Sequence, residues 1–278
     1  PWGMRRLEGG GIWRFQPDSL RLEVFTRGMY NPWGHQFDRW GRSFATDGAG
    51  FQGIHFAFPD VAFDAAQGAE RTMGGLNPDQ PKHASLSVLS GRHLPDSLHG
   101  HLLTNDYRAN TINRFVVSED GSGFSSRQAK DLLWTDHVAF RPVDVRVGPD
   151  GAIYVADWYS PIIQHGEVDF RDPRRDHKHG RIWRITAEDR SPVEPPELEG
   201  APVEMLLVAL KAPEAWTRSH ARRLLEGRGP EAVLPALEEW TDAIDRSVPE
   251  ATHHLLEGLW VYQALGRFDT PLLKEMLG

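Results

Sequence analysis

Hydrophobic and polar residues alternate along this chain with two different periods, one before and one after about residue 190. In the first part they alternate at every second position, as in GIWRF (11–15), TINRF (111–115) and RIWRI (181–185). A period of two is typical of β-strands with one buried face. In the second part, hydrophobic residues recur every three or four positions, which is typical of amphipathic helices. The sequence therefore predicts a mostly β part followed by a helical part.

A proline-rich segment, EDRSPVEPPELEGAP, lies where the period changes. Proline lacks the backbone N–H that helices and sheets use, so this segment cannot continue either element. We predict a β-domain over residues 1–188, a linker over 189–201 and a helical segment over 202–278.

An internal repeat indicates how the β-domain is built. NPWGHQFDRWGRSFATD (31–47) aligns without a gap with RPVDVRVGPDGAIYVAD (141–157). Each copy predicts a strand, a tight turn containing glycine, and a second strand that ends in aspartate, Asp47 in one copy and Asp157 in the other. Repeated groups of short strands are typical of a β-propeller, whose blades are four-stranded antiparallel sheets.

About four blades are visible in this sequence, and we expect roughly six in the complete ring. The predicted strands are 12–16 and 21–26 in the first blade; 31–38 and 42–47 in the second, with its outer half in 52–75; 85–90, 101–107, 111–117 and 130–135 in the third; and 141–147, 152–158 and 181–186 in the last. The last blade lacks its outer strand, which we expect the N-terminal end of a longer chain to supply. Because the sequence begins at Pro1, we expect a fragment of a longer protein.

The helical part has the pattern of paired helices with short connections. Pro202, Pro213 and Pro230 each precede or open a predicted helix, where a missing N–H costs little. Further helices are expected over residues 251–265 and from Pro271. Such pairs predict truncated HEAT-like repeats of an α-solenoid.

Composition excludes several classes of function. The formal net charge of −8 argues against a nucleic-acid-binding protein. No hydrophobic run approaches the length of a membrane-spanning helix. The sequence has no cysteine, which excludes disulfides, thiolate metal sites and covalent haem attachment within these residues.

The insertion over residues 159–180 is the strongest candidate for a ligand site. It connects two strands of the last predicted blade, on the face where the strands that end in aspartate also end. Its acids and histidines are of the types that bind Ca²⁺, namely His165, Glu167, Asp169, Asp172, Asp176, His177 and His179. Its basic residues Arg171, Arg174, Arg175 and Arg181 could instead pair with those acids and hold the loop rigid. Both interpretations stay open.

Three stretches resemble a known family. RGMYNPWGHQFD, RPVDVRVGPDGAIYVADWY and GRIWRI are similar to glucose/sorbosone dehydrogenases, six-bladed propellers that hold pyrroloquinoline quinone (PQQ) and Ca²⁺ on one face. Two longer stretches, SGRHLPDSLHGHLLTNDYRANTINRFVVSEDGSGF and HVAFRPVDVRVGPDGAIYVADWYSPIIQHGEVDFRDPRRDHKHGRIWRIT, resemble more closely a planctomycete and verrucomicrobial family of membrane-bound dehydrogenases. This resemblance covers most of residues 1–190. That resemblance implies a propeller, then HEAT-type repeats, then a haem c domain with a CxxCH motif that is not part of this sequence. It also implies export to the periplasm or outside the cell, a sugar or sugar-alcohol substrate, and a cytochrome-type electron acceptor.

The resemblance assigns roles to residues of this chain. Asn31 corresponds to the polar residue before proline in the family's cofactor segment, whereas Tyr30 stands where that segment has arginine. We expect cofactor contacts and proton transfer from residues near that face, and metal ligands in the insertion. The cofactor-binding candidates are Asn31, His35, Arg108, Arg141, Asp157 and Tyr159; the candidate bases are His137 and His165; the metal candidates are Glu167, Asp169, Asp172, His177 and His179.

Two alternatives accompany these assignments. His35 lies on an inner strand, where a hydrogen bond within the core would equally explain its presence. The whole propeller could be a non-catalytic module that binds a glycan or a protein, with the helical repeats recruiting a partner.

Overall fold

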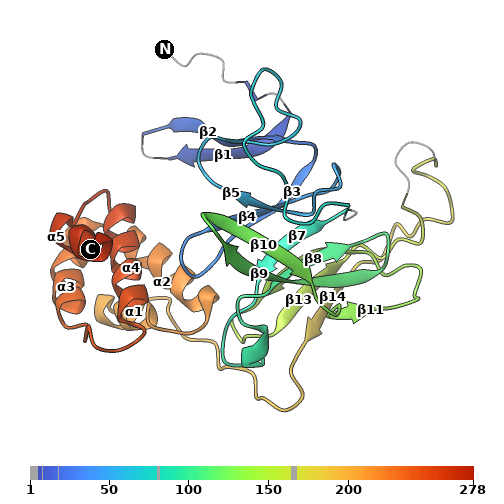
Figure 1. Cartoon of the computed structure of the whole chain (residues 1–278). Helices are drawn as coiled ribbons and strands as arrows, with labels where there is room; N and C mark the ends of the chain where they lie inside the picture. The colour runs from blue at the N-terminus through green and yellow to red at the C-terminus, as the bar shows by residue number, and fades with distance from the viewer. Residues whose placement is uncertain (1–5, 8, 18, 80–81, 164–167) are drawn as a thin grey trace. The chain divides into compact units, whose positions relative to one another are not determined.

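A computed structural model describes residues 6–7, 9–17, 19–79, 82–163 and 168–278. The described residues form two compact units. The first contains the sheets and comprises the described residues up to 89 together with 98–147 and 153–185. The second contains the helices and comprises 90–97, 148–152 and 186–278. Figure 1 shows the strands in blue to yellow and the helices in orange to red.

Four sheets make up the first unit in the described ranges, and all of their pairings except one are antiparallel. The sheets contain β1 (Gly10–Gln16), β2 (Arg21–Met29) and β6 (Val61–Ala62); β3 (Pro32–Phe37), β4 (Ser43–Asp47) and β5 (Ile54–Ala57); β7 (Ala84–Val88), β8 (Leu102–Asp106), β9 (Thr111–Asp120), β10 (Gly123–Gln128) and β11 (Leu133–Trp134); and β12 (Pro142–Val147), β13 (Ile153–Asp157) and β14 (Arg181–Ile185).

The predicted internal repeat is confirmed at the level of register. Pro32 of β3 pairs with Asp47 of β4, and Pro142 of β12 pairs with Asp157 of β13. Both hairpins have an irregularity directly after the proline, because proline has no N–H to donate to a regular ladder. The two hairpins are therefore built alike, although more than a hundred residues separate them.

Neighbouring sheets of the first unit pack their hydrophobic faces together. One buried cluster joins Met29 of β2, Ala45 of β4 and Val61 of β6. Another joins Phe44 of β4, Leu86 of β7 and Phe115 of β9. Strand β7 also contacts both β3 and β12. This succession of small antiparallel sheets, each packed on the next, is compatible with a partial β-propeller.

Two outer strands differ from the sequence prediction. A strand over 130–135 was expected to be the outer strand of the third blade, but β10 (Gly123–Gln128) occupies that position and β11 has only two residues. The hairpin turns at Gly121 with φ +59°, where a glycine opens a two-residue turn that matches the strand twist. In 52–75, only β5 joins the second sheet, whereas β6 pairs in parallel with β2 of the first sheet.

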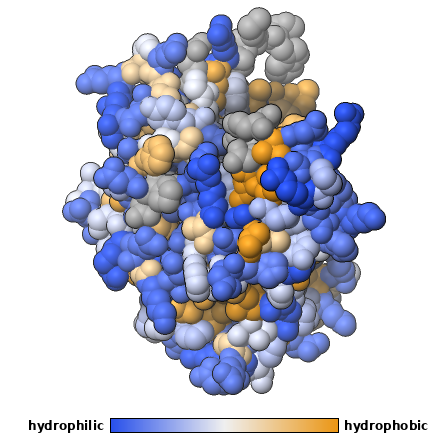
Figure 2. Space-filling view, turned by 90° about the vertical axis from the view of Figure 1, so that its right-hand side faces the viewer, coloured by the Kyte–Doolittle hydropathy of each residue, from blue (hydrophilic) through white to orange (hydrophobic). Residues whose placement is uncertain are grey.

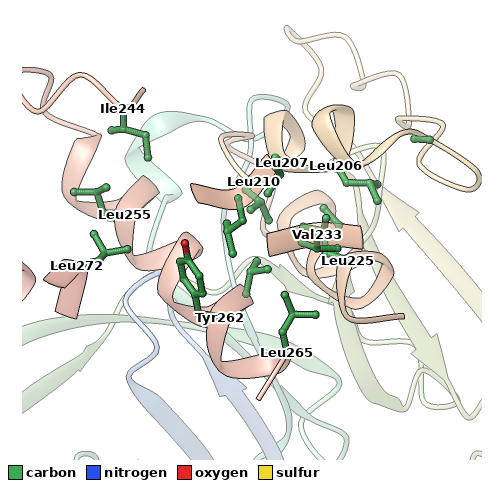
Figure 3. Close-up of a cluster of buried hydrophobic side chains, with 14 of the residues drawn as sticks. Leu206, Leu207, Leu210, Leu225, Val233, Ile244, Leu255, Tyr262, Leu265 and Leu272 are labelled. Carbon is green, nitrogen blue, oxygen red and sulfur yellow. The ribbon is translucent and has the colours of Figure 1, made fainter. Parts of the chain in front are cut away.

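Five helices form the core of the second unit, with bounds close to those predicted. They are α1 (Val203–Ala209), α2 (Ala215–Arg228), α3 (Pro230–Asp242), α4 (Ala251–Ala264) and α5 (Thr270–Leu277). Leucines 206, 207, 210 and 225 and Val233 are at most 1% exposed in their shared core (Figure 3). Helix α3 begins at Pro230, and Pro202 is the N-cap of α1, as the sequence predicted. The HEAT-like repeat remains a prediction.

The segment expected as a linker is held by specific contacts of the second unit. Residues 186–202 contain no helix or strand, but Ala187 donates its N–H to Nε2 of His93 at 3.1 Å. Val193 donates its N–H to the carbonyl of Asp150 at 2.9 Å, and Leu198 is 5% exposed in the helical core. These contacts order the proline-rich segment although it has no regular structure. No helix of the described residues is both long and apolar enough to cross a bilayer.

Candidate functional site

Asp157, predicted to bind a cofactor, instead anchors the chain at the end of β13. Its Oδ1 accepts the backbone N–H groups of Arg141 at 2.8 Å and Tyr159 at 2.9 Å. Its Oδ2 accepts the indole N–H of Trp183 at 3.0 Å. Asp157 is 3% exposed, so both carboxylate oxygens already have partners. The side chain therefore fixes the positions of Arg141 and Tyr159.

Asp47 plays the same part at the end of β4. Its Oδ2 accepts the N–H of Tyr30 at 2.7 Å, and its Oδ1 accepts those of Asn31 at 2.8 Å and Ala49 at 3.0 Å. Asn31 is thus held through its backbone, while the residue itself lies exposed at the surface.

The strand ends at Asp47, Asp106 and Asp157 lie along one edge of the first unit, which we call the aspartate rim. The ring of Trp33, at the start of β3, lies 5.4 Å from that of Tyr107, directly after β8. The carbonyl of Tyr107 in turn accepts a hydrogen bond from Arg141. These contacts join three successive sheets at the same edge.

Arg141 is buried at the aspartate rim, with 9% of its surface exposed. Its Nε donates to the carbonyl of Ser160 at 3.0 Å, its Nη1 to that of Tyr107 at 2.9 Å, and its Nη2 to that of Pro161 at 3.4 Å. Burial lowers the pKa of Arg141 from its ordinary value, and the nearby charge of Asp157 opposes this shift. The guanidinium therefore joins the connection after β8 to the insertion after β13, with neutral carbonyls as its partners.

A pocket of about 470 Å³ opens beside Arg141. Its size is within the range of small-molecule sites. Its lining combines three arginines with a hydrophobic wall from the insertion, and its residues are Arg108, Arg141, Pro161, Ile162, Ile163, Val168 and Arg174. The structure thus brings together two of the six predicted cofactor-binding residues, Arg108 and Arg141.

The three arginines of the pocket differ in their partners. The side chain of Arg174 donates to both oxygens of Asp172, at 2.9 and 2.8 Å, and lowers the pKa of that carboxyl to about 2. Arg108 is positioned by its backbone N–H, which donates to Asp106 at 2.9 Å. Its guanidinium makes no hydrogen bond or ion pair with any residue in the described ranges. None of the described lining residues is acidic, so the pocket is cationic.

Tyr159 begins the insertion in a strained conformation. Its φ of +53° lies in the left-handed region, which costs a non-glycine residue about 1 kcal/mol. The guanidinium carbon of Arg181 lies 3.6 Å from the centre of its ring, a cation–π contact. The rings of His137 and His179 lie 6.0 and 6.2 Å from it. Tyr159 is therefore at the centre of a ring cluster and is not among the residues that line the pocket.

The two described histidines of this cluster have opposite hydrogen-bond patterns. Nδ1 of His137 accepts the N–H of Ala139 at 3.2 Å, so the neutral ring carries its proton on Nε2. Nδ1 of His179 lies 2.8 and 3.1 Å from the oxygens of Asp176 and donates to them, which leaves Nε2 as an acceptor. Hydrogen bonds from the N–H of Lys178 and from His179 lower the pKa of Asp176 to about 2. Only His179 has the arrangement of a base oriented by a carboxylate.

His35 lies apart from this pocket. Its Nε2 lies 2.6 Å from Oγ of Ser43 across the β3–β4 hairpin, and its ring packs edge-on against Phe37. Burial lowers the pKa of His35, which favours the neutral ring. These contacts agree with the alternative of a hydrogen bond within the sheet.

The predicted metal ligands do not converge within the part of the insertion that is described. No group of three or more histidine, aspartate or glutamate side chains is placed for a metal ion among the described residues. Asp172 pairs with Arg174, as the ion-pair interpretation predicted, whereas Asp169 accepts only the backbone N–H of Arg171, at 2.7 Å. His177 is exposed, and His179 pairs with Asp176. His165 and Glu167 lie outside the described residues.

Some contributions to the site were not predicted from the sequence. Tyr107 and Ser160 hold Arg141 through backbone carbonyls, which any residue type could provide. Val168 completes the hydrophobic wall, and only the path of the insertion brings it there. The Asp176–His179 pair did have a signal, because a spacing of three residues suits a turn closed by the aspartate.

Comparisons with known proteins give a family match and distant structural similarities. The family described as a domain of unknown function, DUF7133, matches residues 79–189, which is less than half of the chain. That range includes the aspartate rim from β8 onward and the whole insertion. A search of curated proteins finds no match to this sequence.

Several similar solved structures are sugar dehydrogenases. A protein of Thermus thermophilus described as an oxidoreductase (glucose dehydrogenase) is 20% identical, with a TM-score of 0.43 over 58% of this chain and 46% of that one. The soluble aldose sugar dehydrogenase of Escherichia coli, in its apo form, is 19% identical, with a TM-score of 0.35 over 49% and 44%. The PQQ-bound aldose sugar dehydrogenase of Streptomyces coelicolor is 16% identical, with a TM-score of 0.35 over 59% and 44%. The chain spans less than half the length of these proteins. Similarity at this level does not carry an activity over to this chain.

Proposed function

We propose that this chain belongs to an exported oxidoreductase that oxidises a sugar or sugar alcohol, with its ligand pocket beside the 159–180 insertion. The observation that carries the proposal is the pocket lined by Arg108, Arg141 and Arg174. A concave, partly hydrophobic site with a few convergent charged groups is the usual form of a small-molecule site. The resemblance of residues 1–190 to sugar dehydrogenase propellers supplies the reaction class.

The arginines would bind and orient negative charge. The guanidinium of Arg108 is available for a bidentate contact to an oxyanion, and Arg141 adds a buried positive charge behind it. In a site with a hydrophobic wall, these charges act more strongly than in water. They would hold an anionic ligand and stabilise negative charge that develops during oxidation.

Neither His137 nor His179 is among the described residues that line the pocket. Of the two, His179 is the better candidate for the base that removes the hydroxyl proton. Asp176 holds its Nδ1–H, so Nε2 can accept a proton, and the resulting imidazolium is stabilised by the carboxylate. His137 would first have to give up its bond to Ala139. In the proposed reaction the base takes the hydroxyl proton, and the hydride of the carbinol carbon would pass to a two-electron acceptor that the described residues do not themselves provide.

The described residues fit the family's cofactors only in part. Of the six predicted quinone contacts, Arg108 and Arg141 line the pocket, while Asp157 and His35 already have other partners. The metal candidates form no three-ligand group in the described part of the insertion. No step of the proposal is therefore routed through PQQ or Ca²⁺. These cofactors, a cytochrome-type acceptor with haem c, and a periplasmic or extracellular location rest on the family resemblance.

A second candidate function is supported by aromatic side chains around the same rim. Trp33, Trp134 and Trp158 are 45%, 67% and 48% exposed, and Tyr30 is 56% exposed. Exposed aromatic rings offer flat hydrophobic surfaces at low entropic cost. A non-catalytic propeller that binds a glycan or a protein would use such rings.

Redox turnover distinguishes the two functions. The chain is supplied with PQQ and Ca²⁺, and reduction of an artificial dye acceptor is measured with aldoses, sugar alcohols and uronic acids. An oxidoreductase should reduce the dye in a substrate-dependent way, and His179→Asn should lower kcat by about 100-fold. His177→Asn, on the same insertion, is the matched control and should change kcat little. Affinity for a glycan without dye reduction under any cofactor condition would support the binding module instead.

A further inference from the structure

We infer that the pocket at the aspartate rim selects sugars that carry an oxyanion, such as a uronic acid or a sugar sulfate, over neutral sugars. This inference rests on the proposed function for the sugar and on the pocket's own residues for the charge. It concerns binding, which can be measured without any redox group.

Among the described residues that line the pocket, one arginine, Arg108, has a side chain without a hydrogen-bond or ion-pair partner. This favours a ligand with a single anionic group. Arg174 is already neutralised by Asp172, through hydrogen bonds to both carboxylate oxygens. Arg108 has no such partner among the described residues. Its planar guanidinium can hold one carboxylate or sulfate through two parallel hydrogen bonds. A quinone with several carboxylates would need more free cations than the described lining provides.

Among the described residues, no carboxylate is hydrogen-bonded to the guanidinium of Arg141. Its bonds go to the carbonyls of Tyr107, Arg108, Ser160 and Pro161, and Asp157 acts on the guanidinium only through space. Desolvation makes a buried cation costly unless negative charge lies close to it. An oxyanion bound at Arg108 would bring that charge to the mouth of the same pocket. Binding would thus relieve an electrostatic cost that the protein bears without ligand.

The rest of the lining suits the body of a sugar. Pro161, Ile162, Ile163 and Val168 present aliphatic carbon to the cavity. The C–H face of a sugar ring can pack on such a wall while its charged substituent reaches the arginines. Neutral sugars would share the wall but lack the ionic contact, so we expect charge to set the selectivity.

Calorimetry on the purified chain tests the inference. Glucose, glucuronate, glucose 6-sulfate and inorganic sulfate are titrated at low ionic strength. Glucuronate or glucose 6-sulfate should bind at least about tenfold more tightly than glucose, because a hydrogen-bonded ion pair is worth about that factor. The tighter of the two identifies the preferred oxyanion. Equal binding of glucose and both acidic sugars, or no binding of either acidic sugar, would overturn the inference.

Variants separate a built site from general attraction. Arg108→Gln should remove most of the preference for the acidic sugar while leaving the thermal unfolding temperature unchanged, since Arg108 is exposed. Arg127→Gln, an exposed arginine of β10 that does not line the pocket, is the matched control and should keep the preference. An unchanged preference in Arg108→Gln, or inorganic sulfate that binds as tightly as the acidic sugars, would also contradict the inference.

Failure of this inference and failure of the proposed function give different results. Selective binding of acidic sugars without dye reduction would leave the pocket assignment intact and overturn the oxidoreductase. Dye reduction with no preference for acidic sugars would support the oxidoreductase and overturn the charge selectivity of the pocket.

Discussion

The hairpins β3–β4 and β12–β13 share an anchor but place different side chains at the aspartate rim. In both, the last residue of the second strand is an aspartate that accepts the N–H of the residue before the first strand. That residue is Asn31 in one hairpin and Arg141 in the other. Asn31 is exposed, whereas Arg141 is 9% exposed and donates to four carbonyls. The repeat thus fixes the backbone, and the residues at the two anchored positions differ in their exposure and in their partners.

The connections that follow the two hairpins also differ. After Asp47 the chain turns at Gly48 to Gly50 and continues into the third strand β5 (Ile54–Ala57) within a few residues. After Asp157 it makes the long insertion that supplies the hydrophobic wall of the pocket. Hydrophilic residues cover most of the face shown in Figure 2, and hydrophobic residues there lie in separate areas. A specific site therefore has to come from a local arrangement such as this insertion.

Replacement of Asp157, which anchors the second hairpin, should lower the stability of the protein more than any of the changes that follow. Asp157→Ala would leave the N–H groups of Arg141, Tyr159 and Trp183 without their charged acceptor in a buried position. We expect a loss of about 4 kcal/mol in the free energy of unfolding of the β unit, measured by urea denaturation. Asp47→Ala should cost a similar amount but leave binding in the pocket intact in the molecules that stay folded. A loss of less than about 1 kcal/mol in either variant would show that the aspartates are not anchors.

Between pH 6.5 and pH 4, the change in the free energy of unfolding with pH should come from the buried core around His83 and not from the aspartate rim. Burial, with a smaller contribution from His55, lowers the pKa of His83 from 6.5 to about 4. Above pH 6.5 the ring is neutral in both folded and unfolded chains. As the pH falls from 6.5 to 4 the unfolded chain binds the proton first, so stability should fall by about 3 kcal/mol.

A histidine replacement checks this pH effect. His83→Gln should flatten the fall in stability between pH 6.5 and 4, measured by urea denaturation at several pH values. His177→Gln, at an exposed position, should leave the curve as it is. A curve that His83→Gln does not change would assign the pH dependence to other groups.

Replacement of the residue just before the first strand, Arg141 in one hairpin and Asn31 in the other, should destabilise the protein by different amounts. Arg141→Gln would remove bonds to carbonyls from two connections, so we expect a loss of about 2 kcal/mol in stability and of more than tenfold in affinity for an acidic sugar. Asn31→Ala changes an exposed side chain and should cost less than about 0.5 kcal/mol. Similar losses in the two variants would remove the distinction on which the site assignment rests.

The smallest expected effect is that of pH, near neutrality, on the affinity of the pocket for an acidic sugar. The pKa of Asp172 is lowered to about 2 by the side chain of Arg174, so the pair stays ionised until the pH approaches that value. Affinity for an acidic sugar should therefore be constant, within about twofold, between pH 5 and pH 8 when measured by calorimetry. A steep change in that range would mean that a titrating group takes part in binding.

The sequence was sufficient for the repeated hairpins and for the helices. Alternation and the paired aspartates predicted β3–β4 and β12–β13 in register, because the two periods of hydrophobic residues report directly on which face is buried. It did not locate β10, because a weakly alternating polar strand, GFSSRQ, has little hydrophobic signal. The parallel pairing of β6 with β2 depends on contacts between distant segments, which a local pattern does not contain.

For the site, the sequence predicted residues that lie near one another at the aspartate rim, and their roles stay predictions. Arg108 and Arg141 were predicted and do meet in the pocket. Asp157 was assigned to a cofactor, although its carboxylate is used by backbone N–H groups that no residue type reveals. His179 was assigned to a metal, and in the structure its Nδ1 pairs with Asp176, a contact that the residue types did not predict. Hydrogen-bond partners, rather than residue types, separated these roles.

A crystal structure of the chain with glucuronate would show whether the pocket beside Arg141 binds an acidic sugar. We expect the carboxylate to lie within hydrogen-bond distance of the guanidinium of Arg108, next to Arg141, with the sugar ring against Ile162 and Ile163. A sugar bound instead beside Tyr30 and Asn31 at the other hairpin, or none in the pocket at saturating concentration, would contradict it.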